Sequence, residues 1–336
     1  MNKSDKILVT GAAGFIGSAL VWKLNCSGYE NIILTDRLES DDKWKNLLSL
    51  NYLDYFECDN LFQKLFSGQL DDIKYVFHLG ACSSTTETNN TFLIQNNYEF
   101  TKILAEWCIK NGKKMIYASS AATYGDGSYG MNDGVDNLEK LRPLNMYGYS
   151  KHLFDLYAKK MDWFNGSNGL IGLKYFNVFG PNEYHKGSMR SLVNKAYSEI
   201  SNTREVSLFK SYNPKYKHGE QLRDFIYVKD AVNMTIHLAK ANSSGLFNIG
   251  SGLAHTWIDL VNPIFKSLNI EPKIKFVDMP DSIREKYQYY TCANIDRFIN
   301  TGWDKITYTL ENSVSEYVTN YLVKNKYLGE NQYNYF

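Results

Sequence analysis

The sequence predicts an α/β fold in which helices cover both faces of a doubly wound parallel sheet. Short apolar runs rich in β-branched residues recur along the chain, and each is typical of a strand that is buried on both faces. Segments with helical spacing lie between these runs. Strands that alternate with helices over roughly 170 residues indicate parallel strands joined by helical crossovers.

The predicted strands are short apolar runs that end at glycine or at polar residues. In chain order they are 6–10, 31–35, 75–79, 114–118, 170–176 and 246–249. Two of the intervening helices are predicted from apolar residues that recur at helical spacing. One helix is indicated by Phe100, Ile103, Leu104 and Trp107, and the other by Phe154, Tyr157, Met161 and Phe164.

A glycine-rich turn joins the first predicted strand to a helix. Gly11, Gly14 and Gly17 form G-x-x-G-x-x-G at this point. Glycine permits the tight turn and lets backbone amides approach a pyrophosphate at the helix N-terminus, whose dipole favours anions. The turn therefore predicts a Rossmann-type dinucleotide site, with a tight turn that holds no ligand as the alternative.

The residues after the second predicted strand concern the choice of dinucleotide. Asp36 stands 19 residues beyond Gly17, where a carboxylate commonly binds the ribose 2′-hydroxyl of NAD. Arg37 and Lys43 are cations that can bind the 2′-phosphate of NADP instead. We favour NADP, because Asp36 can turn away while Arg37 stacks on the adenine, and NAD remains the alternative.

Ser120, Tyr147 and Lys151 are the candidate catalytic residues. Ser120 follows the predicted strand 114–118, at the sheet edge where ligands bind in open α/β folds. Tyr147 and Lys151 form Y-x-x-x-K, which places both on one face of a helix. Lys151 is expected to lower the pKa of Tyr147 and to bind the nicotinamide ribose, while Ser120 binds the substrate oxygen. For any one of them alone, a turn serine, a surface aromatic residue or a solvated lysine would be the better interpretation.

Composition excludes several other classes of protein. A net charge of +1 gives no electrostatic basis for binding nucleic acid or an anionic membrane. Five widely spread cysteines without C-x-x-C argue against a disulfide framework and a structural zinc site, so we expect no metal. No apolar run approaches ~20 residues. The N-terminus leads straight into a strand, which leaves no room for a signal peptide and predicts a cytoplasmic location.

The glycine turn, the serine and Y-x-x-x-K together resemble the extended short-chain dehydrogenase/reductase family of nucleotide-sugar epimerases, dehydratases and reductases. Three further runs resemble the ADP-heptose 6-epimerase branch of this family, namely GACSSTTE at 80–87, YFNVFGPNEYHKGSM at 175–189 and LRDFIYVKD at 222–230. The resemblance covers nearly the whole chain. It implies a homo-oligomeric isomerase with bound NADP that inverts C6 of ADP-D-glycero-D-manno-heptose for lipopolysaccharide precursors.

The resemblance also implies that Tyr147 and Lys186 are two acid/base groups. Inversion requires a transient ketone to present both faces to the hydride, with a proton donor or acceptor in each orientation, and the two residues come from different segments. Lys186 must lose a proton to act as a base, so burial or a neighbouring cation should lower its pKa. Without the resemblance, a lysine that faces phosphate or solvent would be the better interpretation of Lys186.

Binding residues follow from the same resemblance, position by position. The implied cofactor contacts are Phe15, Ile16, Asp36, Arg37, Lys43, Leu79, Gly80, Ala81, Cys82, Ser83, Asn96, Lys151 and Val178. The implied substrate contacts are Asn177, Lys186, Ser188, Lys195, Phe209, Ser211, Arg223 and Tyr287. Arg223 is chemically the best diphosphate ligand, and an internal ion pair with Asp224 is its alternative. Cys58, where relatives have a lysine, and Lys195, where a histidine can occur, depart from the pattern.

Regularity weakens after Phe176. Residues 180–223 are rich in Tyr, Lys, Asn and Ser and are typical of a segment that closes over a substrate. The chain is then expected to return to the sheet at 225–250. The predicted dinucleotide domain is therefore 1–178 plus about 224–254. A smaller, discontinuous α/β substrate lobe is predicted for about 179–223 plus 255–330.

Two other functions remain open at this point. A UDP-hexose 4-epimerase or a 4,6-dehydratase would use the same cofactor chemistry, although dehydratases usually follow the catalytic Ser/Thr with Asp-Glu and this chain has Ala121, Ala122 and Thr123. A catalytically silent dinucleotide sensor is the alternative from a different class. Such sensors tend to lose the Tyr or the Lys, and both are present here.

Overall fold

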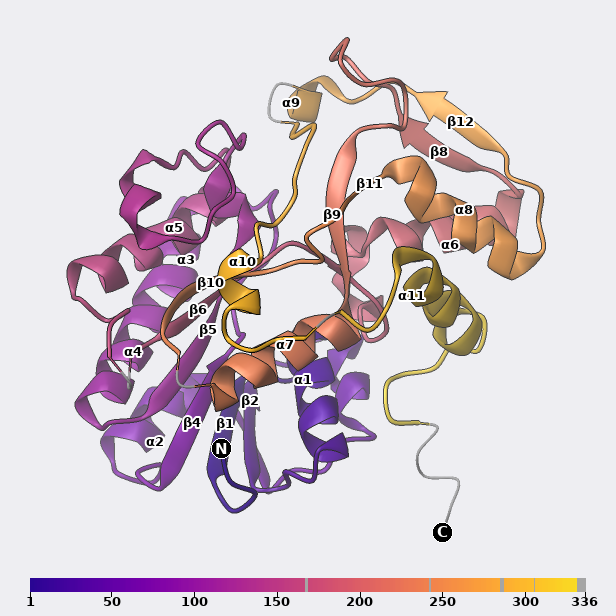
Figure 1. Cartoon of the computed structure of the whole chain (residues 1–336). Coiled ribbons are helices and arrows are strands. Elements are labelled where there is room, and N and C mark those ends of the chain that lie inside the picture. The colour runs from indigo at the N-terminus through magenta and orange to yellow at the C-terminus, as the bar shows by residue number, and fades with distance from the viewer. Residues whose placement is uncertain (167–168, 242, 285–286, 305, 331–336) are drawn as a thin grey trace.

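The central feature of the computed structural model is a parallel seven-stranded sheet with helices on both faces (Figure 1). The structure describes residues 1–166, 169–241, 243–284, 287–304 and 306–330. The strand order is β10-β6-β5-β4-β1-β2-β3, so the chain starts near the middle and winds outward in both directions. This order confirms the predicted doubly wound fold. The strands are β1 (Lys6–Thr10), β2 (Ile32–Asp36), β3 (Asp54–Glu57), β4 (Ile73–His78), β5 (Lys114–Ser120), β6 (Ile171–Tyr175) and β10 (Gly245–Ile249).

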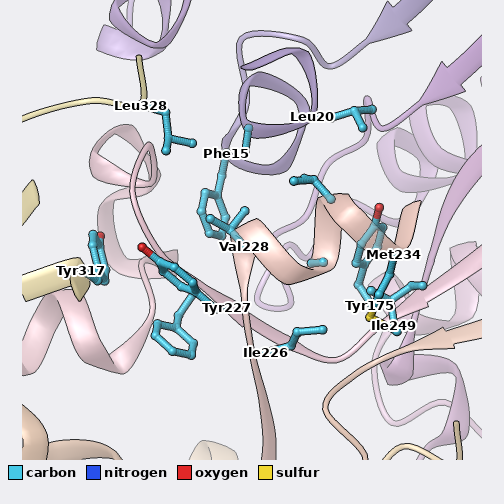
Figure 2. Packing of buried hydrophobic residues seen from close by; sticks show 14 of the residues in the cluster. Phe15, Leu20, Tyr175, Ile226, Tyr227, Val228, Met234, Ile249, Tyr317 and Leu328 are labelled. Atoms are coloured by element: carbon cyan, nitrogen blue, oxygen red, sulfur yellow. The ribbon is translucent and has the colours of Figure 1, made fainter. Parts of the chain in front are cut away.

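Side chains that alternate along the strands form two buried clusters, one on each face of the sheet. Ile7 and Val9 belong to the cluster under α1 and α7, whereas Leu8 belongs to the cluster under α2, α4 and α5. Figure 2 shows Phe15 of α1 beside Val228 of α7 in the first cluster. The helices on this part of the chain are α1 (Phe15–Cys26), α2 (Leu61–Phe66), α3 (Asn90–Leu93), α4 (Phe100–Lys110), α5 (Met146–Lys160) and α7 (Val228–Lys240).

The second lobe contains two small sheets. One has the order β11-β9-β7 and the other pairs β12 with β8. Their strands are β7 (Asn177–Phe179), β8 (Val206–Phe209), β9 (Leu222–Tyr227), β11 (Ala254–Thr256) and β12 (Ile274–Val277). The helices are α6 (Leu192–Thr203), α8 (Trp257–Leu268), α9 (Asp281–Arg284), α10 (Asp296–Ile299) and α11 (Leu310–Tyr317). None of the helices that the structure describes is long and apolar enough to span a bilayer.

The return of the chain to the main sheet differs in detail from the prediction. Only β10 rejoins the seven-stranded sheet. The residues of β9 instead pair with β7 and β11, so the segment at 222–227 bridges the two parts of the molecule before α7 begins. The residue limits given above for the two lobes remain a prediction.

A fully buried ion pair supports the end of the sheet on which the site is built. Lys174 Nζ of β6 lies 3.1 Å from Asp155 Oδ2 of α5. The hydroxyls of Tyr117 and Ser119 donate to the same carboxylate at 2.7 and 2.8 Å. Lys174 also donates to Thr123 Oγ1 at 2.6 Å. These hydrogen bonds compensate the buried charges, and the network fixes α5 against the carboxyl end of β5.

Candidate active site

Three cavities with shared walls form one cleft at the carboxyl ends of β1, β4 and β5. Their volumes are about 410, 280 and 260 Å³. The first is lined by Gly11, Gly14, Phe15, Ile16, Gly17, Asp36, Lys43, Leu79, Gly80, Ala81, Cys82, Ser83, Tyr147, Lys151 and Lys186. The second adds Ser120, Asn177 and Val178, and the third adds Arg37 and Asn96. A larger open groove, of about 850 Å³, lies near Arg204 and the end of α8, and it contains none of the predicted site residues.

The glycine turn forms one wall of the cleft. Gly11 has a φ of +66°, and a Cβ there would lie 2.5 Å from the Gly80 nitrogen. A Cβ on Gly17 would lie 2.0 Å from the Gly11 oxygen. Helix α1 begins at Phe15, and its N-cap, Gly14, has no side chain to cap the helix. The amides of the first turn thus remain available for an anion, and the turn fits the pyrophosphate of a dinucleotide.

Asp36 braces the glycine turn. Its Oδ2 accepts two backbone N–H groups of that turn, at 2.8 and 3.2 Å. Lys43 Nζ lies 3.5 Å from Asp36 Oδ1 and compensates its charge. The Arg37 guanidinium pairs with Asp59 at 2.6 Å. Asp36 is therefore engaged with protein groups, while Lys43 and Arg37 line the adjoining cavity.

Tyr147 and Lys151 lie in the first turns of α5, close to Ser120 at the end of β5. The helix starts here because the Asn145 side chain caps it by accepting the Gly148 N–H at 2.8 Å. Burial raises the pKa of Tyr147, and a hydrogen bond with Ser120 opposes that shift. The observed environment thus differs from the expectation that Lys151 lowers this pKa.

The ammonium group of Lys151 is engaged elsewhere. Its Nζ donates to the Ala118 carbonyl at 3.0 Å. Burial lowers the pKa of Lys151 to about 8. The residue therefore lies close to the balance between its charged and neutral forms at physiological pH. Lys151 also lines the first cavity, so it is placed to contact a ligand there.

Lys186 enters the cleft from the short helix η6 (Tyr184–Met189). Its Nζ donates to Ser83 Oγ at 3.2 Å. Burial lowers the pKa of Lys186, against the opposing effect of the Glu183 charge. Lys186 and Tyr147 both line the 410 and 280 Å³ cavities, although they come from different segments. Two titratable groups thus converge on one space.

Residues from the C-terminal part of the chain anchor the loop that carries Lys186. The Tyr317 hydroxyl donates to the Glu183 carboxylate at 3.0 Å. The Tyr184 hydroxyl donates to the Tyr321 carbonyl at 3.2 Å. The Leu328 N–H donates to the side-chain oxygen of Asn182, directly before Glu183, at 2.9 Å. The loop is therefore held at three successive residues.

On the substrate side, Asn177 and Val178 line the second cavity together with Trp257. Arg223 is buried, and its guanidinium lies 5.5 Å from the Trp257 ring centre and 5.0 Å from that of Tyr287. Tyr287 accepts a hydrogen bond from the Trp257 indole at 2.9 Å. Neither Arg223 nor Tyr287 lines any of the three cavities, and their contact with substrate remains a prediction.

Arg223 and Asp224 do not form the internal ion pair that was the alternative interpretation. Adjacent residues of β9 point to opposite faces of the strand. The Asp224 carboxylate instead accepts N–H groups from Ser251, Gly252 and Ala293 at 2.6 to 2.9 Å.

Besides Arg223 and Tyr287, four more predicted substrate residues line none of the three cavities, namely Ser188, Lys195, Phe209 and Ser211. Lys195 Nζ donates to the Ser188 carbonyl at 3.4 Å. Phe209 ends β8, and the Ser211 N–H donates to His218 Nδ1 at 3.0 Å. Their role in binding substrate stays a prediction. Within the described residues, no group of three His, Cys, Asp or Glu side chains is arranged to hold a metal ion.

Some cleft residues were not predicted from the sequence. They are chiefly His185, Met189, Phe225, Trp257 and Leu260. His185 and Met189 stand within the run that identified Lys186, so that run carried a signal for them. Trp257 and Leu260 come from α8 and reach the cleft only through the tertiary fold.

Comparison with known proteins places these features in a family. The model of the NAD dependent epimerase/dehydratase family matches residues 7–250. The ADP-L-glycero-D-manno-heptose-6-epimerase of Nitratidesulfovibrio vulgaris strain DP4 is 48% identical over 317 residues, which cover 94% of this chain and 97% of that protein. The protein from Fusobacterium nucleatum with the same name is 45% identical over 328 residues, which cover 95% of this chain and 98% of that protein.

A solved structure shows the same similarity. The Helicobacter pylori ADP-L-glycero-D-manno-heptose-6-epimerase superposes with a TM-score of 0.78 at 28% identity, covering 95% of this chain and 96% of that chain. The matched sequence includes the glycine turn, Ser120, Tyr147, Lys151 and Lys186. The chain belongs to the NAD dependent epimerase/dehydratase family.

Proposed function

We propose that this protein inverts C6 of the heptose in ADP-D-glycero-D-manno-heptose and so forms ADP-L-glycero-D-manno-heptose. The observation that carries the proposal is the convergence of Tyr147 and Lys186 on the same two cavities from different segments. The relatives that bear this activity in their names are 45 and 48% identical over nearly their full length. A nicotinamide dinucleotide is the cofactor that the glycine turn and the family support.

The chemistry supplied by a bound nicotinamide is reversible hydride transfer, which oxidises the C6 carbinol to a ketone and then reduces that ketone on its other face. Tyr147 and Lys186 move the protons at the C6 oxygen. One of them accepts the hydroxyl proton during oxidation, and the other donates a proton to the ketone oxygen during reduction. The Ser120 hydroxyl holds that oxygen beside Tyr147.

Direct incubation with candidate substrates tests the proposed function. The purified protein should invert ADP-D-glycero-D-manno-heptose, and the carbinol proton at C6 should change its NMR signal accordingly. No oxidised or reduced cofactor should accumulate, because the electrons return to the substrate. UDP-glucose is the matched alternative, since a UDP-glucose 4-epimerase from Thermotoga maritima also superposes with a TM-score of 0.75. Turnover of UDP-glucose alone would contradict the heptose assignment.

We further infer that NADP is preferred over NAD. Asp36 is occupied by the glycine turn and by Lys43, which reduces its ability to accept a ribose hydroxyl. Lys43 and Arg37 line the 260 Å³ cavity beside Asp36, where a 2′-phosphate would find positive charge.

Lys43→Ala is therefore expected to weaken NADP binding selectively. Loss of a hydrogen bond to a charged group corresponds to about a tenfold or larger rise in the Kd for NADP. The Kd for NAD should change much less, and isothermal titration calorimetry can measure both values. Lys45→Ala is the matched control, since Lys45 lies on the same short helix but pairs with Asp42 at 2.9 Å. Equal losses for NAD and NADP would contradict the 2′-phosphate contact.

A further inference from the structure

His185 is a cleft residue to which the proposed function gives no role. It precedes Lys186 on η6 and lines the 410 Å³ cavity together with the glycine turn. The short helix η1 (Asp42–Leu47) packs against η6 at this point. His185 therefore lines the same cavity as the residues at the N-terminus of α1.

The Asn46 side chain of η1 lies against this imidazole. Its amide nitrogen donates to the Ala13 carbonyl at 2.8 Å and to the Asn182 carbonyl at 3.1 Å, and lies 3.3 Å from His185 Nδ1. Because both carbonyl oxygens need a donor, the amide nitrogen of Asn46, and not its oxygen, must face them. The orientation holds even though Asn46 Oδ1 finds no partner among the described residues.

The protonation state of His185 follows from these contacts. The two amide hydrogens of Asn46 are directed to the two carbonyl oxygens, and the amide nitrogen is no acceptor, so a proton on the facing Nδ1 would meet only another donor. Burial lowers the pKa of His185 to about 4, helped by Lys186 and Lys43 and opposed by Asp41. The ring is therefore neutral near pH 7 and carries its single proton on Nε2. In the described part of the chain, Nε2 has no protein partner.

Lys43, Lys151 and Lys186 line this cavity and outnumber its two carboxylates, Asp36 and Asp41, so an anion is a suitable acceptor for the Nε2–H. The amides at the start of α1 face the same cavity, and Asn46 ties the backbone of the glycine turn to His185. A pyrophosphate bound at those amides would present its remaining oxygens to the other residues of this cavity.

We propose that His185 donates its Nε2–H to a pyrophosphate oxygen of the bound dinucleotide, and that Asn46 is the positioning residue for the ring. This inference rests on the proposed function, because it requires a dinucleotide in the cleft. His185 and Lys186 are neighbours on η6. A dinucleotide that binds His185 would therefore also help to hold Lys186 in place.

Dinucleotide affinity tests the proposal without any need for epimerase activity. Calorimetry would give the Kd of the wild-type protein, His185→Leu and His185→Gln for NADP, NAD and ADP-ribose, which carries the pyrophosphate but no nicotinamide. His185→Leu should raise all three Kd values by about ten- to a hundredfold, the range for a lost hydrogen bond to a charged group. His185→Gln should retain most of the affinity, because its side-chain amide restores an N–H donor. Thermal unfolding would check that both variants are folded.

Each other outcome decides against the inference. Unchanged Kd values in His185→Leu would show that the ring does not contact the cofactor. A loss confined to NADP would place it at the 2′-phosphate, and equal losses in the Leu and Gln variants would indicate packing rather than a donated hydrogen bond. Failure of the wild-type protein to bind any of the three ligands would overturn the proposed function itself. That result is distinguishable, because it appears before any variant is made.

Discussion

Tyr147→Phe is expected to lower kcat by about 10²- to 10⁴-fold, the usual contribution of a general acid or base. The substitution removes one hydroxyl that faces the cavity shared with Lys186 and leaves the ring in place. Ser120 then loses the hydroxyl with which its side chain forms a hydrogen bond. Discontinuous NMR assay of ADP-heptose inversion would measure the loss, and calorimetry should show an almost unchanged Kd for the dinucleotide.

Tyr149→Phe is the matched control for this experiment. Tyr149 lies on the same helix, but its side chain is 44% exposed and lines none of the three cavities. Its variant should keep wild-type turnover. Wild-type turnover in Tyr147→Phe would remove Tyr147 from the proposed mechanism, whereas equal losses in both variants would indicate a general effect on α5.

Lys186→Met should reduce inversion by a similar factor, because one face of the ketone then lacks its proton donor. The Lys186 ammonium is held by Ser83, and burial already lowers its pKa, so the neutral form needed in a base is accessible. Lys186→Arg distinguishes proton transfer by Lys186 from a role in which only its positive charge matters. A guanidinium keeps the positive charge but does not release its proton, so this variant should also be inactive.

The Arg variant gives the experiment its sharpest outcome. If Lys186 only bound a phosphate group, Lys186→Arg would retain much of the activity while Lys186→Met lost it. Retained activity in Lys186→Arg would therefore contradict the two-base scheme. The Kd for the dinucleotide, measured in parallel, should stay within a few-fold of the wild-type value in both variants if the loop keeps its position.

The parts of the site that could be predicted from the sequence are those whose functional residues lie within one short segment of known local structure. The glycine turn needs only neighbouring residues, since Gly11 and Gly17 approach each other within one turn. Tyr147 and Lys151 share a helix face by spacing alone. Each predicted strand segment also contains a strand in the structure, because each is an apolar run that suits a strand buried inside the sheet. β3 was missed, because its four residues begin and end with an acid.

The remaining features depend on contacts between distant segments. Trp257 of α8 contacts Phe225 and Arg223 of β9 although more than 30 residues separate them in the sequence, which no local pattern reveals. The environment of Tyr147 is set by burial and by Ser120, 27 positions earlier, rather than by the lysine one turn away. The partnership of Asn46 with His185 spans 139 positions. Such contacts require the folded chain.

The anchoring of residues 182–184 by Tyr317, Tyr321 and Leu328 sets an order of events during synthesis. A growing polypeptide can complete the nucleotide-binding sheet while its last segment is still inside the ribosome. The loop that delivers the second proton-transfer group would at that stage lack every one of those three tethers. A dinucleotide would at first meet the glycine turn alone, while the His185 contact and the placement of Lys186 would both wait until residues 317–328 have docked.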